Sequence, residues 1–444
     1  MPRSALTLES RGRAAGRRQA EGIQPRPHVV IVGAGFAGLD CARQLAGGAV
    51  SVTVVDRNNH HTFQPLLYQV ATSGLGPPDV AYPVRGILRR FPNVAFRQAE
   101  VEDVDWDGRV LRLDEGRTLG FDYLVMAAGA QTGWFGVPGA DEHALPLYQL
   151  SDAIGVRNHV LEQFEEASWE HDGGRLPAGR LTFVIVGGGP TGVEMAGALQ
   201  ELIDHVLVKD FPDLDTSASE IVLVEMGDAV LESFSPNAQR HAADDLRRRG
   251  IDVRLGTKVA EVASDEVVLS SGERIPTRTV IWAAGVRANA LADAMGVAQT
   301  QGGRIVVDAR LSIPGRPGAF AVGDIAAAED GDGHVLPQLA PVAKQSGEFV
   351  GRAILDEVAD RRPTHFRFHD RGTMATIGRN SAVADLPFGI KLSGRVAWLA
   401  WLFLHLLFLA GFRNRLSVLV DWSWSFLTHE RAPRVIVTWP EPRR

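Results

Sequence analysis

The chain has 444 residues, 45% of them hydrophobic and 22% charged, which excludes a disordered protein and allows two or three domains with large cores. Its formal charge is −7, with basic ends on an acidic middle: residues 1–28 carry six arginines against two glutamates. The single cysteine, Cys41, excludes a disulfide or a paired-cysteine redox centre within one chain, and we expect it to pack in the core.

The first 27 residues are rich in arginine and lack the apolar core of a secretory signal. We expect a disordered basic extension over 1–27, with an arginine-rich targeting peptide as the alternative. The C-terminal region, 389–444, has eight basic residues against three acidic ones and is also apolar. This combination favours contact with an anionic membrane over contact with nucleic acid.

The first motif predicts a strand, a helix and a second strand that together bind a dinucleotide. A buried strand at 29–32 runs into Gly33-x-Gly35-x-x-Gly38, and a second β-branched strand ends on Asp56. Gly33 allows a tight turn, Gly35 lets the backbone approach a pyrophosphate, and Gly38 allows the helix to pack closely on the strand. Asp56 would accept hydrogen bonds from a ribose diol. The alternative is an ordinary glycine-rich turn.

A polar loop at 57–68, punctuated by Pro65, follows this unit, and a later strand at 123–126 ends in Ala127-Ala128-Gly129. Together these stretches predict a first nucleotide site. Its candidate cofactor contacts are Gly33, Gly35, Phe36, Ala37, Gly38, Asp56, Arg57, Gln64, Ala128 and Gly129.

The same order of features then recurs, which indicates an internal duplication. A strand at 183–186 runs into a second Gly-x-Gly-x-x-Gly, a strand at 221–225 ends on an acid, and a strand at 280–282 ends in Ala-Ala-Gly. From the first fingerprint glycine to the glycine of Ala-Ala-Gly is 96 residues in one copy (33 to 129) and 98 in the other (187 to 285). Two dinucleotide sites of similar architecture are therefore predicted. The candidate contacts of the second copy are Gly187, Gly189, Pro190, Thr191, Gly192, Glu225, Ala284 and Gly285.

Two acids carry further predictions. Glu225 favours NADH over NADPH, because a carboxylate accepts from a ribose 2′-hydroxyl and repels a 2′-phosphate. Asp324, which follows Gly323 after a short strand, can hydrogen-bond a ribityl hydroxyl at the start of a helix. The alternative for Asp324 is a structural helix cap.

The apolar end of the chain predicts a membrane contact. Residues 396–412 carry no formal charge and are bounded by Arg395 and Arg413, and residues 416–427 are apolar around Asp421. We favour two amphipathic helices lying in the membrane interface, with one transmembrane helix or a helix pair buried in a dimer as alternatives. The two histidines of this region, His405 and His429, lack partners at ligand spacing, so no metal site is predicted.

Two fingerprints, two Ala-Ala-Gly strand ends and a late Ala-Val-Gly-Asp together resemble the two-dinucleotide-binding-domain flavoproteins. The resemblance implies an α/β fold with two Rossmann-like domains, FAD in the first and NADH in the second, with Gly323 and Asp324 closing the FAD site. It divides the chain into the extension 1–27, an FAD-binding domain at 28–150 and 298–385, an inserted NADH-binding domain at 151–297, and a C-terminal membrane-association domain at 386–444.

Within that superfamily, three stretches resemble type II NADH:quinone oxidoreductases: HHTFQPLLYQVATSGL, LAPVAKQSGEFVGR and the apolar tail from 397 to 427. The resemblance implies a respiratory-chain enzyme in which tightly bound FAD takes a hydride from NADH and passes two electrons to a quinone, without proton pumping. It further implies a homodimer held peripherally on the cytoplasmic face of the cell membrane, with residues 395–428 against lipid.

The resemblance also assigns two catalytic candidates. Glu194 matches the family's glutamate near the nicotinamide, although a charge that complements the helix dipole is an equal alternative. Gln345 matches the second glutamine of the family's quinone-site pattern, whereas Pro341 replaces the first. Two other classes of function stay open: a soluble-type reductase that serves an iron–sulfur partner such as a ferredoxin, and a nucleotide-sensing flavoprotein.

Overall fold

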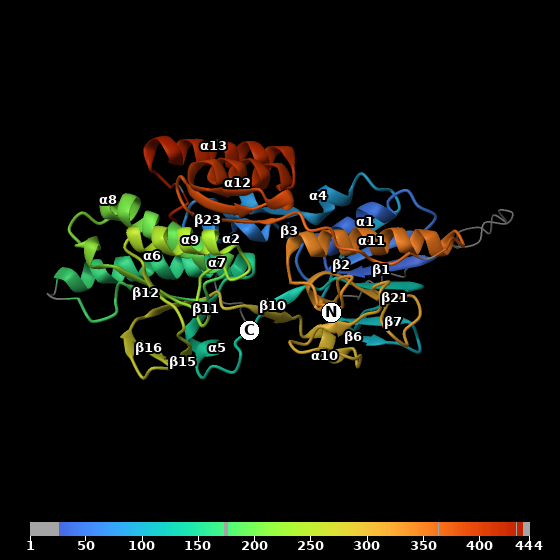
Figure 1. Ribbon diagram of the computed structural model, residues 1–444. Coiled ribbons are helices and arrows are strands. Elements are labelled where there is room, and N and C mark those ends of the chain that lie inside the picture. Colours follow the sequence, from blue (N-terminus) through green and yellow to red (C-terminus); the bar gives the residue numbers. More distant parts are fainter. Residues whose placement is uncertain (1–25, 173–175, 363, 432, 438–444) are drawn as a thin grey trace, which may run out of the picture.

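Two five-stranded parallel sheets, each built around one glycine fingerprint, form the body of the chain (Figure 1). The computed structural model describes residues 26–172, 176–362, 364–431 and 433–437, so almost all of the predicted N-terminal extension lies outside the described residues. The first sheet has the order β21 (Ala319–Ala321), β9 (Tyr123–Met126), β1 (His28–Val32), β2 (Ser51–Asp56) and β5 (Val94–Gln98). The second has the order β11 (Ala144–Pro146), β18 (Thr279–Trp282), β12 (Thr182–Val186), β13 (Glu220–Val224) and β14 (Asp252–Arg254).

The central strands β1 and β12 are continuous apolar runs because both faces of each sheet are covered. Val29 and Ile31 of β1 belong to the core under α1 (Phe36–Leu45) and α11 (Ala340–Val358), whereas Val30 and Val32 belong to the core on the opposite face. In the second sheet the covering helices are α6 (Leu150–Asp172), α7 (Pro190–Leu202) and α9 (Pro236–Arg248). Alternating side chains of a strand therefore contribute to two cores.

Smaller pieces complete the two lobes. Three-stranded antiparallel sheets are formed by β6 (Val101–Asp105), β7 (Val110–Leu113) and β8 (Thr118–Gly120), and by β15 (Val259–Val262), β16 (Glu266–Leu269) and β17 (Arg274–Pro276). Two-stranded pairs are β3 (His60–Thr62) with β4 (Ala81–Pro83), and β20 (Ile305–Val306) with β22 (Ala326–Ala327). Short helices are α2 (Leu67–Ala71), α3 (Pro77–Val80), α4 (Val84–Leu88), α5 (Ala140–His143), α8 (Val208–Asp210) and α10 (Leu291–Ala294).

Some strands belong to a different sheet from the one that their position in the sequence suggests. Strand β21 follows the second sheet in sequence but pairs with β9 of the first, and β11 pairs with β18 of the second sheet although the domain boundary was expected at 150. Strands β10 (Ala130–Thr132) and β19 (Val286–Ala288) form an antiparallel pair between the lobes. Each begins directly after an Ala-Ala-Gly sequence, so this pair joins the ends of the two motifs.

The C-terminal part begins earlier than residue 386, where the boundary was expected. Strands β23 (Thr373–Gly378) and β24 (Ser381–Asp385) form one sheet with β25 (Lys391–Ser393), and this sheet packs on α7 and α9 of the second lobe. A Cβ on Gly197 of α7 would lie 1.8 Å from the Ile377 carbonyl oxygen, so helix and strand are in backbone contact. This contact ties 373–393 to the second lobe rather than to the first.

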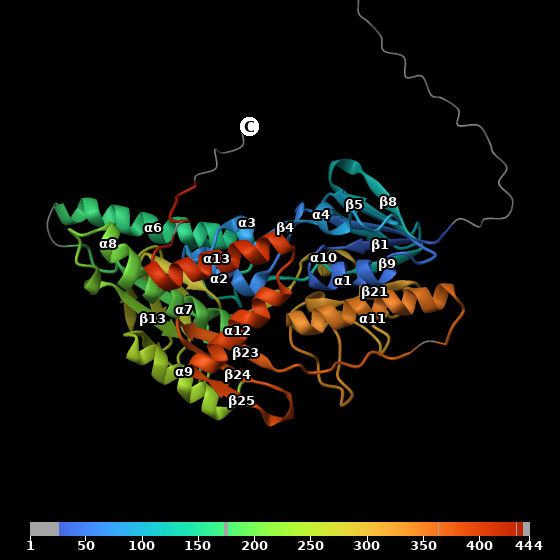
Figure 2. The same ribbon diagram turned by 90° about the horizontal axis from the view of Figure 1, so that it is seen from above.

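Two helices follow, as predicted for the tail: α12 (Gly394–Phe408) and α13 (Phe412–Thr428). Figure 1 shows both (red) on top of the lobe that holds α7, and Figure 2 shows them from above, beside β23–β25. In the described part of the chain no helix combines the length and apolarity needed to cross a bilayer.

Candidate functional site

The first fingerprint folds into a turn in which each glycine has a separate reason. Gly33 has φ +107°, and a Cβ there would lie 2.2 Å from the Ala127 carbonyl oxygen. A Cβ on Gly38 would lie 1.9 Å from the Gly33 carbonyl oxygen, so α1 rests directly on the turn. Gly35 has φ −74° and ψ −166°, and a Cβ there would meet no atom within 4 Å. Gly33 and Gly38 are thus required by the fold, whereas Gly35 keeps space free.

That space is a cavity of about 720 Å³, here called the first cavity. It runs from the end of β2 past the fingerprint to the loop around Asp324. Of the ten candidate contacts in the first copy, all but Gly38 line it, and so do Gly323 and Asp324. The structure therefore brings together residues that are separated by almost 300 positions in sequence.

The Asp56 carboxylate is held by the backbone at the far end of the first cavity. One oxygen accepts from the Ala34 amide at 2.7 Å and the other from the Asn58 amide at 2.7 Å. Burial raises the pKa of Asp56, and the two amide hydrogen bonds oppose that rise. Each oxygen keeps a free lone pair, so the side chain can still accept from a ribose diol.

At the opposite end, Asp324 caps no helix. Its carboxylate accepts from the Tyr148 hydroxyl at 3.3 Å, and burial raises its pKa against the influence of Tyr148 and Arg304. The Tyr148 hydroxyl also accepts from the Ala130 amide at 3.3 Å, directly after the first Ala-Ala-Gly. Tyr148 lines the first cavity and was not predicted, because it belongs to no motif and approaches the site through the chain crossing between the lobes.

The second fingerprint repeats this geometry closely. Gly187 has φ +108°, a Cβ on Gly192 would lie 1.8 Å from the Gly187 carbonyl oxygen, and a Cβ on Gly189 would meet nothing within 4 Å. Pro190 begins α7, where its missing N–H has no cost, and Thr191 beside it is exposed. The open glycine and the free helix N-terminus form a second cradle for an anionic group.

Glu225 repeats the role of Asp56. One oxygen accepts from the Gly188 amide at 2.5 Å and the other from the Gly227 amide at 2.6 Å. In both copies the acid thus bonds the residue after the first glycine and the residue two positions beyond itself. The predicted duplication is present in the hydrogen bonds as well as in the sequence.

Glu194 lies in neither cradle but in a second cavity of about 600 Å³ beneath α12 and α13, here called the tail cavity. The Thr376 amide donates to Glu194 at 3.2 Å, and the side chain is 8% exposed. Burial raises the pKa of Glu194 to about 8, opposed by the Thr376 amide and the Trp401 indole. The carboxyl is therefore neutral at pH 7 and can act as a proton donor.

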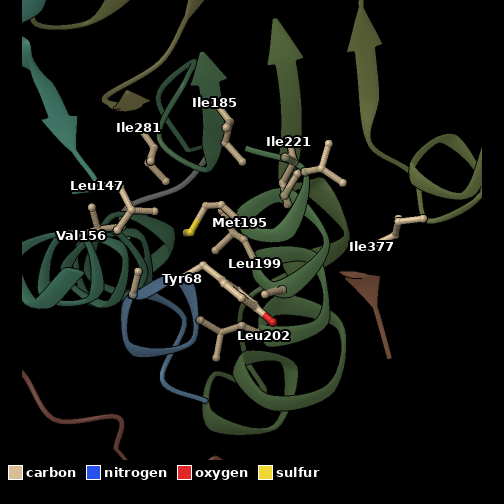
Figure 3. Close-up of a cluster of buried hydrophobic side chains, with 14 of the residues drawn as sticks. Tyr68, Leu147, Val156, Ile185, Met195, Leu199, Leu202, Ile221, Ile281 and Ile377 are labelled. Carbon is tan, nitrogen blue, oxygen red and sulfur yellow. The ribbon is translucent and has the colours of Figure 1, made fainter. Parts of the chain in front are cut away.

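Tyr68 lines the tail cavity together with Glu194. Its hydroxyl lies 3.2 Å from the Thr376 hydroxyl, and its ring lies against Met195, Leu199 and Leu202 of α7 (Figure 3). Tyr68 lines the tail cavity, while Gln64, four residues earlier, lines the first cavity. The stretch 64–77 thus contributes residues to both cavities.

Gln345 lines neither cavity. Its side-chain amide donates to the His369 carbonyl oxygen at 3.0 Å, and its side-chain oxygen accepts from the His369 amide at 3.0 Å. Both polar atoms are committed to holding the segment that enters β23. These contacts give Gln345 a structural role, and its catalytic role stays a prediction.

Among the described residues, one group of side chains has the spacing to hold a metal ion: Asp330, Asp332 and His334 on an exposed loop. The Asp330 carboxylate already accepts from the amides of Asp332 and His334, which accounts for the cluster as a local turn. The absence of a metal centre stays a prediction.

Comparison with known proteins covers nearly the whole chain. Residues 27–347 match the family described as pyridine nucleotide-disulphide oxidoreductase, and residues 370–429 match the NDH2 C-terminal domain. Type II NADH:quinone oxidoreductase Ndh of Mycobacterium tuberculosis is 36% identical over 427 residues, which cover 93% of this chain and 91% of that protein. The type II NADH:quinone oxidoreductase of Staphylococcus aureus is 31% identical and covers 84% of this chain and 93% of its own.

Solved structures agree on the fold. NDH2 from Plasmodium falciparum in complex with NADH has a TM-score of 0.82 at 19% identity, over 93% of this chain and 100% of that one. The sulfide:quinone oxidoreductase of Aquifex aeolicus has a TM-score of 0.70 at 17% identity, over 88% of this chain and 92% of that one. The C-terminal match begins at residue 370, close to the start of β23 and ahead of the predicted boundary at 386.

Proposed function

The chain belongs to the type II NADH:quinone oxidoreductases, and from this premise we propose that it oxidises NADH and reduces a quinone at a membrane surface through bound FAD. One observation carries the proposal: the β10–β19 pair joins the two Ala-Ala-Gly ends, at Gly129 and Gly285. A dinucleotide in each cradle then has one half beside this pair. This pair would therefore hold the reacting halves of FAD and NADH beside each other.

The residues of the first cavity fit FAD. A volume of about 720 Å³ suits a cofactor site, Gly35 leaves room for a pyrophosphate at the start of α1, and Asp56 and Asp324 offer acceptors at the two ends. Bound FAD supplies the redox chemistry, because it takes a hydride from NADH and passes two electrons to the quinone. The chain supplies position, exclusion of water and acceptors for the ribose and ribityl hydroxyls.

NADH is proposed for the second cradle because Glu225 accepts from two backbone amides and retains lone pairs for a ribose diol.

Glu225→Arg is expected to lower kcat/KM for NADH on the order of 100-fold and to reduce the ratio of kcat/KM for NADH to kcat/KM for NADPH. The substitution removes the acceptor and puts a cation where a 2′-phosphate would lie. Steady-state kinetics with both nucleotides measure the change. Glu232→Arg, an equal charge change at a nearby exposed acid, should leave the ratio intact; an equal effect of both variants would contradict the assignment.

The tail cavity suits a quinone. Its inner end holds Glu194, which is neutral at pH 7, and its walls are aromatic and aliphatic residues of α12 and α13, Trp401 and Leu402 among them. Because the stretch 64–77 lines both cavities, we expect a quinone ring in the tail cavity to lie close to bound FAD. This arrangement favours electron transfer from the FAD site to a lipid-soluble acceptor.

We propose that α12 and α13 bind the membrane peripherally, on its cytoplasmic face. Apolar residues with large exposed fractions lie on these helices outside the tail cavity: Val396, Phe412, Leu416, Val420 and Trp424. Their inner faces are pinned to the body, since Asn414 donates to the Pro78 carbonyl oxygen at 2.9 Å and Trp422 donates to the Gln69 side-chain oxygen at 2.7 Å. A rigid apolar face flanked by Arg395 and Arg413 suits the headgroup region of an anionic bilayer.

Replacing Val396, Phe412 and Val420, which do not line the tail cavity, by serine is expected to weaken binding to anionic vesicles on the order of 100-fold. Each side chain is more than half exposed in the structure, so folding should be unaffected. Co-sedimentation with vesicles measures the loss, and activity with a water-soluble quinone analogue should persist. Trp169→Ser, at an exposed tryptophan of α6, is the control.

The same apolar faces could instead pair in the predicted homodimer. Sedimentation in detergent distinguishes the two uses: a serine triple variant that changes from dimer to monomer without losing vesicle binding would assign the face to self-association.

The function is tested by the absorbance spectrum of the purified protein, before and after NADH and then a quinone. We expect a flavin spectrum that NADH bleaches and quinone restores. Protein without flavin, or flavin that a quinone fails to reoxidise, would overturn the proposal. Reoxidation only by an iron–sulfur protein would favour the soluble-type reductase.

A further inference from the structure

One aromatic side chain near the second cradle is not packed into a hydrophobic core. Phe135 lies on the loop after β10, with its side chain 65% exposed. Its φ is +52° and that of Gly136 is +71°, so the loop holds a bulky residue in the left-handed region. This conformation is unfavourable for an aromatic residue, and exposing the ring adds to the cost. The Phe135 ring is therefore held at the surface and is not buried.

The loop under Phe135 is rigid. The Gly133 amide donates to the Gly285 carbonyl oxygen at 3.1 Å, and the Trp282 indole donates to the Gly133 carbonyl oxygen at 2.8 Å. Trp134 packs on Trp282 with ring centroids 5.7 Å apart. The two residues before Phe135 are thus fixed to β18 and to the residues that follow that strand.

The Phe135 ring lies directly over Gly285. Its Cζ would be 3.2 Å from a Cβ on Gly285 and 2.8 Å from a Cβ on Gly133, so both positions must be glycine for the ring to lie there. Gly285 follows Ala284, whose Cα would be 2.6 Å from a Cβ on Gly187, the first glycine of the second fingerprint. The ring therefore borders the second cradle.

Strand order shows which half of a dinucleotide passes this ring. In the second sheet β12 lies between β13, which is followed by Glu225, and β18, which runs into Ala283-Ala284-Gly285. With the pyrophosphate at the fingerprint turn and the adenosine ribose on Glu225, the other half of the molecule extends towards β18. That half carries the nicotinamide.

We propose that the Phe135 ring contacts the nicotinamide riboside half of NADH and holds it in place beside the β10–β19 pair. This inference rests on the proposed function, in which NADH occupies the second cradle. An exposed phenyl ring on a rigid loop can stack on a planar ring or cover a ribose face, and both contacts exclude water without adding charge. The proposal makes Phe135 a contact for one half of the substrate only.

The experiment compares two ligands of the FAD-loaded protein: NAD⁺, and ADP-ribose, which has the adenosine and pyrophosphate but lacks nicotinamide. Phe135→Ala is expected to weaken NAD⁺ binding about tenfold and to leave the Kd of ADP-ribose unchanged. Phe135→Tyr keeps the ring and should bind both ligands as the wild type does. Trp169→Ala, at an exposed tryptophan of α6, should change neither Kd.

Equal weakening of both ligands in Phe135→Ala would overturn the proposal, because it would indicate a contact to the shared half or a disturbed loop. Unchanged or tighter NAD⁺ binding would overturn it as well. The rate of flavin bleaching by NADH in the wild type is measured in parallel. If NADH fails to bleach wild-type flavin, the proposed function itself fails; if it does bleach it and the Kd values do not diverge, only the role of Phe135 is lost.

Discussion

Gly35→Val is expected to give a folded protein without FAD. A Cβ at position 35 would meet no protein atom within 4 Å, and φ −74° with ψ −166° is open to valine, so we expect the substitution to leave the fold intact. The isopropyl group instead fills the space in which the backbone approaches a pyrophosphate. We expect FAD affinity to fall by about 4 kcal/mol, on the order of 10³-fold.

Gly189→Val is the matched variant, because the second fingerprint has the same geometry and the same open space. It should purify with flavin at wild-type content and lose bleaching by NADH. Thermal unfolding of the cofactor-free proteins checks that both variants fold. The assignment of FAD to the first cradle would be wrong if Gly35→Val retained flavin, or if Gly189→Val lost it.

Much of the two cradles could be predicted from sequence because their determinants are local. The turn at Gly33, the close packing at Gly38 and the acid at the end of β2 all lie within one strand–helix–strand unit. Their spacing predicts a glycine turn with an acid beside it, and the structure shows the Asp56 carboxylate beside that turn, where it accepts from the Ala34 and Asn58 amides. The repeat at Gly187 and Glu225 strengthens that prediction, since the same contacts recur.

The surroundings of Glu194 could not be predicted in the same way. Its amide donor, Thr376, is 182 residues away, and its indole neighbour, Trp401, is on the tail helix. No periodicity in α7 indicates that β23 and α12 pack on it. Gln345 shows the reverse case: a position that fits a family pattern is used to hold the backbone of His369, a contact that only the folded chain reveals.

Two of the predicted domain boundaries, at 150 and 386, differ from the strand pairing for a related reason. The predicted boundaries were placed at residues where motifs end. In the folded chain, a segment belongs to the lobe whose strands and helices it contacts. Strand β11 is too short to be recognised as a strand of the second sheet, and β23 belongs with the second lobe because Gly197 allows α7 to touch it. Amino-acid composition does not identify segments that cross between the lobes in this way.

Glu194→Gln is expected to impair reduction of the quinone and to remove a pH dependence centred near 8. Burial raises the pKa of Glu194 to about 8, so the wild-type carboxyl is protonated below that pH and can donate to a quinone oxygen. The rate of flavin reoxidation by quinone should therefore fall as pH rises through about 8. Glutamine cannot supply the proton, so the variant should be about 100-fold slower and flat across this range.

The stability of Glu194→Gln provides an independent check. Because the folded pKa of Glu194 lies above its ordinary value of 4.5, the folded state holds the proton more tightly than the unfolded state. The wild type thus loses stability as pH rises from 4.5 to about 8, and the variant escapes this loss. The difference in Tm, variant minus wild type, should therefore increase as the pH rises from 4.5 to about 8. Glu166→Gln, at an exposed acid of α6, should show no such trend.

The two half-reactions separate the two possible places for Glu194. Its family resemblance puts it beside the nicotinamide, whereas the structure puts it in the tail cavity with Tyr68, Thr376 and Trp401. A role at the nicotinamide would slow flavin bleaching by NADH in Glu194→Gln. A role in the tail cavity leaves bleaching unchanged and slows only reoxidation by quinone. Stopped-flow measurement of both steps decides between them, and we expect the second result because the carboxyl lies in the tail cavity and lines no part of the first.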